Sequence, residues 1–365
     1  MRPTRGRIIT VESLAELDRR LDAGARRLHG WRLVGLDLRG HSDRLRRCDT
    51  SRTTFAGCAF AGDDAEHHAL RGALILPSVR ETPIDPHRDA LYTAEELYDT
   101  TPYARTLDAR AYAWQHERTS PDAALARALH DEGIDAALDR WARGRRLVGV
   151  MGGHALRRGE PDYADAARLG RLLGGTATVA TGGGPGAMEA VNLGARLADR
   201  PEADLAEAIA MLAPAPSYHP SADAWVDTAR AVRERFPGAV ESLGVPTWHY
   251  GHEPPNLFAT AIAKYFRNAL REAILLELCG AGIVFLPGAG GTVQEIFQDA
   301  CENYYATEDR IAPMVLVGRR HWTETLPAWP LLRALAQGRP MEAHIHLVDT
   351  VDEAAAIVAL PGDTR

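Results

Sequence analysis

TATVATGGGPGAMEAVNLGARL, residues 176–197, joins an apolar run to a helix-like stretch through a turn that contains four glycines. A second stretch of the same kind, IVFLPGAGGTVQE, occupies residues 283–295. A glycine-rich turn between a strand and a helix brings bare backbone N–H groups and the positive end of a helix against an anion, usually a phosphate. Two such turns on one sheet predict a small phosphorylated ligand that is held from two sides.

The chain from residue 145 onward alternates strand-like and helix-like segments. We expect strands at 147–151, 176–181, 208–212, 283–286, 314–317 and 345–348, and helices at 163–173, 187–197, 257–278 and 351–358. This alternation indicates an α/β fold, a Rossmann-like doubly wound parallel sheet with helices on both faces. Ligands of such sheets bind outside the carboxyl ends of the strands, which is where both glycine turns fall.

The sequence suggests three regions, namely an accessory region at 1–120, a helical bridge at 121–144 and a nucleotide-binding domain at 145–365 with an insertion at about 214–251. The accessory region has a mixed α+β texture, with strand-like stretches at 31–38, 53–60 and 73–76. Phe55 and Phe60 have the same spacing as Leu33 and Leu38, which hints at a stacked β-coil. Two pairs are too few to establish a repeat, and the role of this region stays open.

Composition excludes several classes of protein. The chain has 365 residues, 45% of them hydrophobic, and a net charge of −7, which gives no electrostatic basis for binding a nucleic-acid polymer. No apolar run is long enough for a membrane span, and residues 1–7 lack the apolar core of a signal peptide, so we expect a cytoplasmic protein. The four cysteines, which we expect to be free thiols, are Cys48, Cys58, Cys279 and Cys301.

The first glycine turn has two interpretations, a cradle for a phosphate or ribose and a tight strand-to-helix turn without a ligand. It does not match the dinucleotide pattern, because no acidic residue ends a strand about 20 residues further on. It is not a P-loop either, since no Gly-Lys-Ser/Thr follows.

The side chains around the second turn also have competing roles. Thr292 and Glu295 have the spacing of a capping box, in which Glu295 would bond back to the helix start, whereas catalysis needs its carboxylate to face the ligand. Arg267 and Arg271 lie four apart on a predicted helix, where they form either a solvated basic face or a contact with phosphate. We interpret His249 and His252 as loop residues rather than metal ligands, and Trp225 and Trp248 as packing residues.

These motifs resemble those of the LOG (Lonely Guy) family, long mislabelled as lysine decarboxylases, over about residues 145–320. The form TGGGPGAMEA, with Glu253-Pro254-Pro255-Asn256, is most similar to bacterial pyrimidine/purine nucleotide 5′-monophosphate nucleosidases. The resemblance implies a homodimeric or larger enzyme that cleaves the N-glycosidic bond of a nucleoside 5′-monophosphate, without a metal or redox cofactor. It implies that Glu295 and Arg271 are catalytic, with Arg267 as the alternative arginine. The substrate- and phosphate-binding residues that we expect are Gly152, Gly153, Gly182, Gly183, Gly184, Gly186, Met188, Glu189, Asn256, Arg267, Gly288, Gly290, Gly291 and Thr292.

The chain departs from the family pattern at three positions. Ala289 replaces the second glycine of the second motif, Gln294 replaces the usual acidic residue before Glu295, and Glu272 stands where the family spacing places an arginine. These changes leave a second hypothesis open, a nucleotide-binding sensor without turnover. A pyridoxal-phosphate decarboxylase is disfavoured because Lys264, the only lysine, is expected in mid-helix away from both glycine turns.

Overall fold

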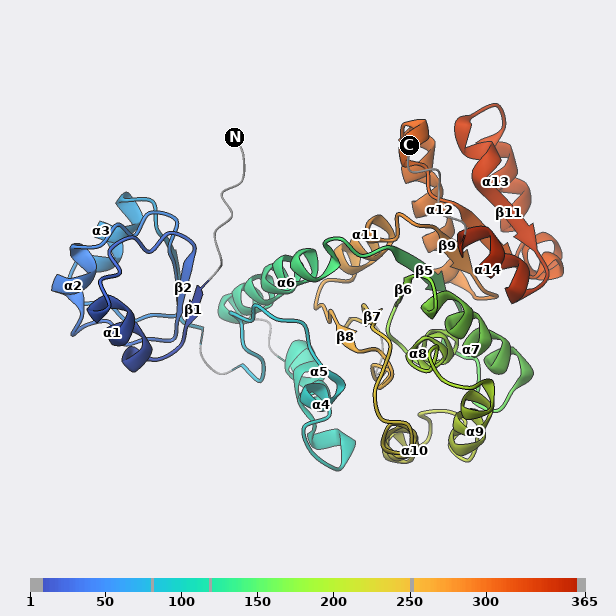
Figure 1. Cartoon of the computed structure of the whole chain (residues 1–365), viewed down its shortest axis with the longest axis horizontal. Coiled ribbons are helices and arrows are strands. Elements are labelled where there is room, and N and C mark those ends of the chain that lie inside the picture. The colour runs from blue at the N-terminus through green and yellow to red at the C-terminus, as the bar shows by residue number, and fades with distance from the viewer. Residues whose placement is uncertain (1–8, 80–81, 118–119, 250–252, 360–365) are drawn as a thin grey trace. The chain divides into compact units, whose positions relative to one another are not determined.

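The computed structural model describes residues 9–79, 82–117, 120–249 and 253–359, which form two units (Figure 1). The first unit contains Met1–Arg88 and Thr119–His130, and the second contains Asp89–Arg118 and Asp131–Arg365. Helix α6 (Pro121–Ala142) therefore begins in the first unit and ends in the second.

The boundary between the units differs from the one expected near residue 120. Tyr92 and Ile262 exchange backbone hydrogen bonds of 2.8 and 2.9 Å, which attaches the segment after residue 88 to the edge of the main sheet. Asp108 is buried and accepts hydrogen bonds from Lys264 and from the indole N–H of Trp248. Residues 89–118, which include α4 (Ala94–Leu97), η1 (Tyr103–Arg105) and α5 (Leu107–Glu117), consequently belong to the second unit.

The first unit is a small stacked coil of strands and helices. Its strands β1 (Ile9–Val11), β2 (Trp31–Val34), β3 (Thr54–Ala56) and β4 (Leu74–Leu76) pair in parallel in that order, and α1 (Leu14–Asp22), α2 (Ser42–Arg46) and α3 (Asp64–Leu70) connect them. The register aligns Leu33 with Phe55 and Phe55 with Ile75, so equivalent side chains of successive coils stack in the core. The repeat that the sequence only hinted at is present.

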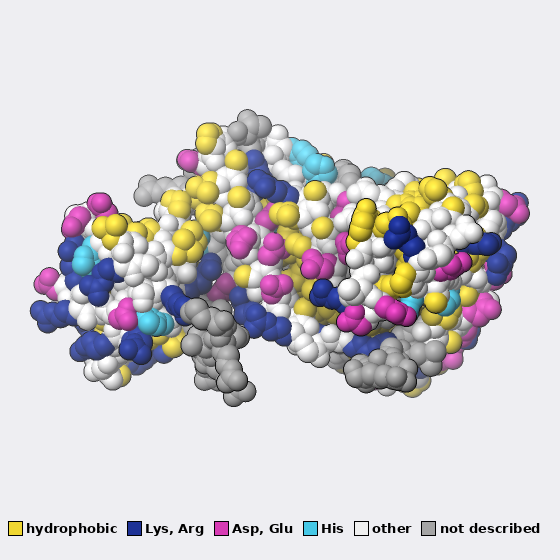
Figure 2. Space-filling view, turned by 90° about the horizontal axis from the view of Figure 1, so that it is seen from above, with side chains coloured by type: hydrophobic (Ala, Val, Ile, Leu, Met, Phe, Trp, Pro, Cys, Tyr) yellow, Lys and Arg dark blue, Asp and Glu magenta, His cyan; other side chains and the backbone are white. Residues whose placement is uncertain are grey.

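Charged side chains of both signs cover the first unit, at the left of Figure 2. Many of them pair with each other, as Arg44 does with Asp18 at 2.5 Å and Arg46 with Asp64 at 2.5 Å. All four cysteines of the chain are free thiols. Among the residues that the structure describes, no helix combines the length and the hydrophobicity that crossing a bilayer requires.

The second unit contains a sheet of seven parallel strands in the order β11-β10-β9-β5-β6-β7-β8. These strands are β5 (Leu147–Met151), β6 (Thr178–Thr181), β7 (Ser242–Gly244), β8 (Ala261–Ile262), β9 (Ile283–Phe285), β10 (Met314–Val317) and β11 (Ile345–Val348). The order runs outward from β5 on both sides, which confirms the predicted doubly wound, Rossmann-like α/β fold.

Helices cover both faces of this sheet (Figure 1). One face carries α7 (Pro161–Gly174), α8 (Ala187–Arg196) and α14 (Val351–Ala359), and the other carries α11 (Asn268–Leu278), α12 (Gly290–Tyr305) and α13 (Ala328–Ala336). Right-handed crossovers in opposite directions from β5 require this distribution. The remaining elements are α9 (Glu202–Leu212), α10 (Ala222–Arg235), η2 (Glu308–Arg310), the π-helical η3 (His321–Thr325) and η4 (Pro340–His344).

Two predicted elements are wrong. Residues 208–212 form the end of helix α9, not a strand, because Leu205, Ala208 and Leu212 bury one helical face. The strand that pairs with β6 is β7. It lies inside the predicted insertion, and all of its residues are buried. The predicted helix at 257–278 is helical only over α11, since its first part forms the buried strand β8 and the extended segment that carries Lys264.

Candidate functional site

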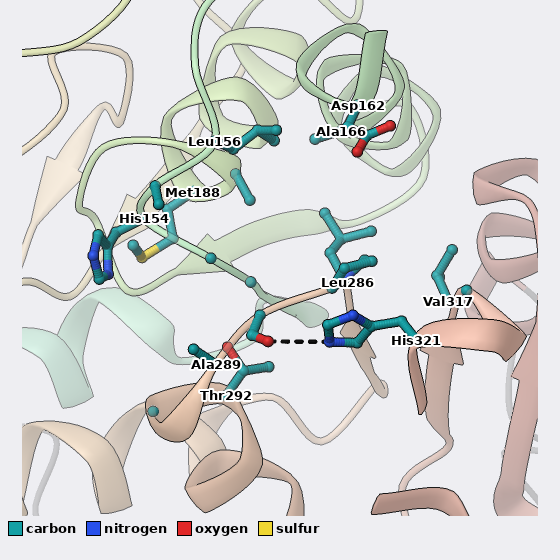
Figure 3. A pocket seen from close by; sticks show the side chains of 18 of the residues that line it. His154, Leu156, Asp162, Ala166, Met188, Leu286, Ala289, Thr292, Val317 and His321 are labelled. Atoms are coloured by element: carbon teal, nitrogen blue, oxygen red, sulfur yellow. Dashed lines mark hydrogen bonds between the residues drawn. The ribbon is translucent and has the colours of Figure 1, made fainter. Parts of the chain in front are cut away.

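A cavity of about 1090 Å³ opens at the carboxyl ends of β5, β9, β10 and β11 (Figure 3). The order of the strands reverses between β5 and β9, and in doubly wound sheets this reversal opens a crevice that binds ligands. The segments after these strands line the cavity with Gly152, Gly153, His154, Gly288, His321 and Asp349. Helix α11 contributes Arg271 and Glu272, and α12 contributes Gly290, Gly291, Thr292, Gln294 and Glu295.

The second glycine turn presents the amino end of α12 to this cavity. The helix begins at Gly290, and its first internal hydrogen bond joins Val293 N to Ala289 O at 3.0 Å. The N–H groups of Gly290, Gly291 and Thr292 precede that bond and have no acceptor within the helix. Gly288 O lies 3.0 Å from Nε2 of His321, which fixes the turn against the loop after β10 (Figure 3). The amino end of α12, with its positive helix dipole, therefore lies at the cavity.

The capping box predicted from Thr292 and Glu295 is wrong. Ala289 is the N-cap, so Thr292 already lies within the first turn of α12 and no side chain caps the helix. Thr292 instead packs over Gly288, where an added methyl group would lie 2.2 Å from the Thr292 hydroxyl oxygen. This register frees the carboxyl group of Glu295 from the helix start.

Glu295 projects from α12 to the cavity, and its side chain is 13% exposed. Burial raises the pKa of this carboxyl to about 7, although the charge of Arg271 lowers the pKa and the charge of Glu272 raises it further. One oxygen of Glu295 lies 3.8 Å from Nη1 of Arg271. A carboxyl with this pKa can take up or release a proton near neutral pH.

Of the two candidate arginines, the structure brings only Arg271 to the cavity. Its Nε donates to Val245 O at 2.7 Å, which fixes the guanidinium beside the carboxyls of Glu272 and Glu295. Arg267 is the N-cap of α11, and its exposed side chain does not line the cavity.

The glycines of the first turn do not line this cavity, although they were expected to hold a phosphate. Residues 182–187 are buried, and an added methyl group at Gly182 would lie 2.7 Å from Arg271 Nη2. Gly183 and Gly186 have φ angles of 71° and 72°, and methyl groups there would meet Pro246 at 2.7 Å and Gly153 O at 2.6 Å. Glycine at these three positions therefore allows the turn to pack closely against Arg271, Pro246 and Gly153.

The start of the helix that follows this turn lies at two cavities of the second unit. Met188 lines the main cavity. Gly186 faces a second one of about 470 Å³, next to Tyr218.

Two further predicted residues stabilise the first turn. Glu189 is buried and accepts hydrogen bonds from Arg158, at 2.5 and 3.0 Å, and from the Tyr163 hydroxyl at 3.1 Å. The Asn256 amide donates to Gly184 O at 3.1 Å. Neither side chain is free to contact a ligand in the main cavity.

Some residues at the cavity were missed by the sequence reasoning. His154 follows Gly152-Gly153 after β5, and His321 follows β10. Their positions just after predicted strands could have identified them as residues of the site. Nδ1 of His154 lies 3.6 Å from Glu253 Oε1. Glu272 and Gln294, noted only as departures from the family pattern, lie against each other, and Gln294 Nε2 donates to Glu272.

The remaining candidates lie away from the cavity. Trp225 and Trp248 are each 1% exposed, which confirms them as packing residues. Lys264 is buried against Asp108 in an extended segment, not in mid-helix, and it does not line the cavity. His249 is exposed, and His252 lies outside the described residues.

No protein-family model matches this chain, and no curated protein matches it in sequence. The chain is similar in structure to the molybdenum cofactor binding protein of Rippkaea orientalis, at a TM-score of 0.37 and 16% identity over 59% of this chain and 96% of that chain. It is also similar to the protein TM1055 (TM-score 0.35, 19% identity, 58% of this chain and 98% of that chain). A third similar structure is the molybdenum cofactor carrier protein of Chlamydomonas reinhardtii (TM-score 0.34, 17% identity, 59% and 96%).

Proposed function

We propose that the second unit hydrolyses the N-glycosidic bond of nucleoside 5′-monophosphates and releases a free base and ribose 5-phosphate. The observation that carries this proposal is the position of Glu295, a carboxyl with a pKa of about 7 that lies beside both Arg271 and the open amino end of α12. The site thus combines a proton-exchanging group with a binding site for an anion.

The amino end of α12 is suited to bind the 5′-phosphate. The free N–H groups of Gly290, Gly291 and Thr292 donate toward the cavity, and the helix dipole favours negative charge there. The guanidinium of Arg271 adds positive charge on the same side. A cavity of about 1090 Å³ has room for a mononucleotide, because small-molecule sites commonly measure about 300–1,000 Å³.

Glu295 supplies the acid–base chemistry in this proposal. Cleavage breaks the bond between C1′ and the base nitrogen, and the ribose passes through an oxocarbenium-like transition state. Water adds its oxygen to C1′, and the proton that water loses balances the one gained by the departing base. Glu295 exchanges that proton or stabilises the cationic ribose, and Arg271 orients Glu295 or the phosphate.

The test is a panel of AMP, CMP, UMP, GMP and prenylated AMP, with chromatographic detection of the released base. We expect Glu295→Gln to lower kcat by about 10²–10⁴-fold with a modest change in nucleotide binding, because the amide cannot exchange a proton. Turnover that is unchanged in Glu295→Gln would contradict the assignment.

A sensor that binds nucleotides without turnover is the second candidate. The 3.8 Å separation between Glu295 and Arg271 is longer than a hydrogen bond, so no contact between them aligns the carboxyl for chemistry. Calorimetric titration with the same nucleotides separates the two functions, since tight binding without released base supports the sensor. The expected homodimer stays a prediction, which light scattering would test.

A further inference from the structure

Glu272 is a second acidic side chain at the cavity, and it is firmly held. The residue lies on α11, is 6% exposed and lines the same cavity as Glu295. The Asn268 amide donates to Oε1 at 2.7 Å, and the Gln294 amide donates to Oε2. Both carboxylate oxygens therefore accept from side-chain amides, which fixes their orientation.

Glu272 and Glu295 share one cation. Nη1 of Arg271 lies 3.8 Å from Oε1 of Glu272 and 3.8 Å from Oε1 of Glu295. A single guanidinium cannot balance two carboxylates in a buried setting, so ionisation of one disfavours ionisation of the other. Two side-chain amides donate to the carboxylate of Glu272, whereas the part of the chain that the structure describes places no hydrogen-bond donor on the carboxyl of Glu295.

We propose that Glu272, fixed by Asn268 and Gln294, is a positioning residue that carries the negative charge opposite Arg271 and thereby keeps the proton on Glu295. The charge of Glu272 indeed contributes to the raised pKa of Glu295. The inference rests on the proposed function for its kinetic test alone, because the protonation of Glu295 can be measured without any substrate.

The other charged and titratable groups around Glu295 are the same in the protein and in a variant changed only at Glu272. Arg271 faces it from α11, and Asp299, whose pKa burial raises to about 8, follows one turn later on α12. His321 lies after β10, and His154 and Glu253 also line the cavity. A change at Glu272 alone leaves these groups in place, so the comparison isolates its charge.

The direct test is an infrared titration of the carboxylic acid band of Glu295 in the full chain, with Glu295→Gln to assign the band. In Glu272→Gln we expect the midpoint of this band to fall by about one pH unit, because a nearby like charge is removed. Glu277→Gln is the matched control, since it removes an exposed charge from the same helix outside the cavity. A midpoint that stays unchanged in Glu272→Gln overturns the inference.

A reciprocal variant guards against simple loss of structure. The exchange variant, Glu272→Gln combined with Gln294→Glu, keeps one carboxylate and one amide at this pair of positions, so the midpoint should return toward the original value. Thermal unfolding checks that each variant is folded. A midpoint that stays as low in the exchange variant as in Glu272→Gln contradicts the electrostatic role.

Kinetics distinguish the inference from the proposed function. If nucleotides are hydrolysed, the limb of the pH–rate profile that reports Glu295 should move with the infrared midpoint in Glu272→Gln. A limb that does not move overturns the inference and leaves the hydrolase intact. If no nucleotide is hydrolysed, the proposed hydrolase fails, and the infrared midpoint still decides the role of Glu272.

Discussion

The two glycine turns have similar sequences and different roles in the folded protein. Each follows a strand of one parallel sheet and precedes a helix, α8 after the first turn and α12 after the second. The first turn is buried, and its glycines allow close contact with Arg271, Pro246 and the backbone at Gly153. At Gly290 and Gly291 of the second turn an added methyl group would meet nothing within 4 Å.

The glutamates that follow the turns show the same contrast. Glu189 on α8 is fully engaged by Arg158 and Tyr163. Glu295 on α12 is 3.8 Å from Arg271, and burial raises its pKa to about 7. A glycine turn with a glutamate is therefore not in itself a site. The partners of the carboxyl and the space around the glycines decide whether it stabilises the fold or faces a ligand.

The largest effect on stability is expected from breaking the buried ion pair between Glu189 and Arg158. Glu189→Ala leaves the guanidinium of Arg158, which is 1% exposed, without its carboxylate, and this should lower the free energy of unfolding by about 3–5 kcal/mol. Urea denaturation measures the change. Glu207→Ala is the control, because its pair with Arg235 is exposed and should contribute about 0–1 kcal/mol. Equal losses of unfolding free energy in Glu189→Ala and Glu207→Ala would show that the buried pair does not stabilise the fold more than an exposed one.

Gly183→Ala should have the next largest effect. Its φ of 71° disfavours a side chain, and the added methyl group would approach Pro246 to 2.7 Å, so we expect a loss of about 2–4 kcal/mol in stability. Gly280→Ala adds a methyl group with nothing within 4 Å and serves as the control in the same denaturation experiment. A Gly183→Ala protein as stable as the control would show that the first turn is not closely packed.

Glu295→Gln should stabilise the protein, in a manner that depends on pH. The pKa of Glu295 is raised from 4.5 to about 7 in the folded state, so the unfolded chain binds fewer protons between these values and stability falls as pH rises through this window. Removal of the carboxyl should therefore gain about 3 kcal/mol at pH 8 and nothing at pH 4. Thermal unfolding at both values measures the difference, and a gain that is equal at pH 4 and pH 8 would argue against titration of Glu295.

The smallest effect on stability is expected at the second turn. Gly291→Ala places a methyl group in open space at the cavity, so stability should change by less than about 0.5 kcal/mol. The same methyl group narrows the access to the N–H groups of α12, and affinity for AMP should decline in calorimetric titration. Unchanged affinity would indicate that this turn does not bind the phosphate.

The sequence determined the elements whose signal is local. Apolar runs gave β5, β9, β10 and β11, and the alternation of strands with helices led to the parallel, doubly wound sheet. Failures occurred where a helical face or a buried strand had no distinct local pattern, as in α9 and β8. The strand–turn–helix pattern placed both glycine turns correctly, because a backbone that must turn sharply or lie close to its neighbours requires glycine wherever it occurs.

Only the tertiary structure decided how the site is composed. The helix start at Gly290 rather than at Thr292 released Glu295, and the orientation of α11 brought Arg271 and Glu272 to the cavity while Arg267 stayed exposed. These outcomes depend on contacts between segments far apart in the chain, such as the one between Arg271 and Val245 O. Spacing within one helix cannot reveal such contacts, since it fixes which side chains share a face but not what that face meets.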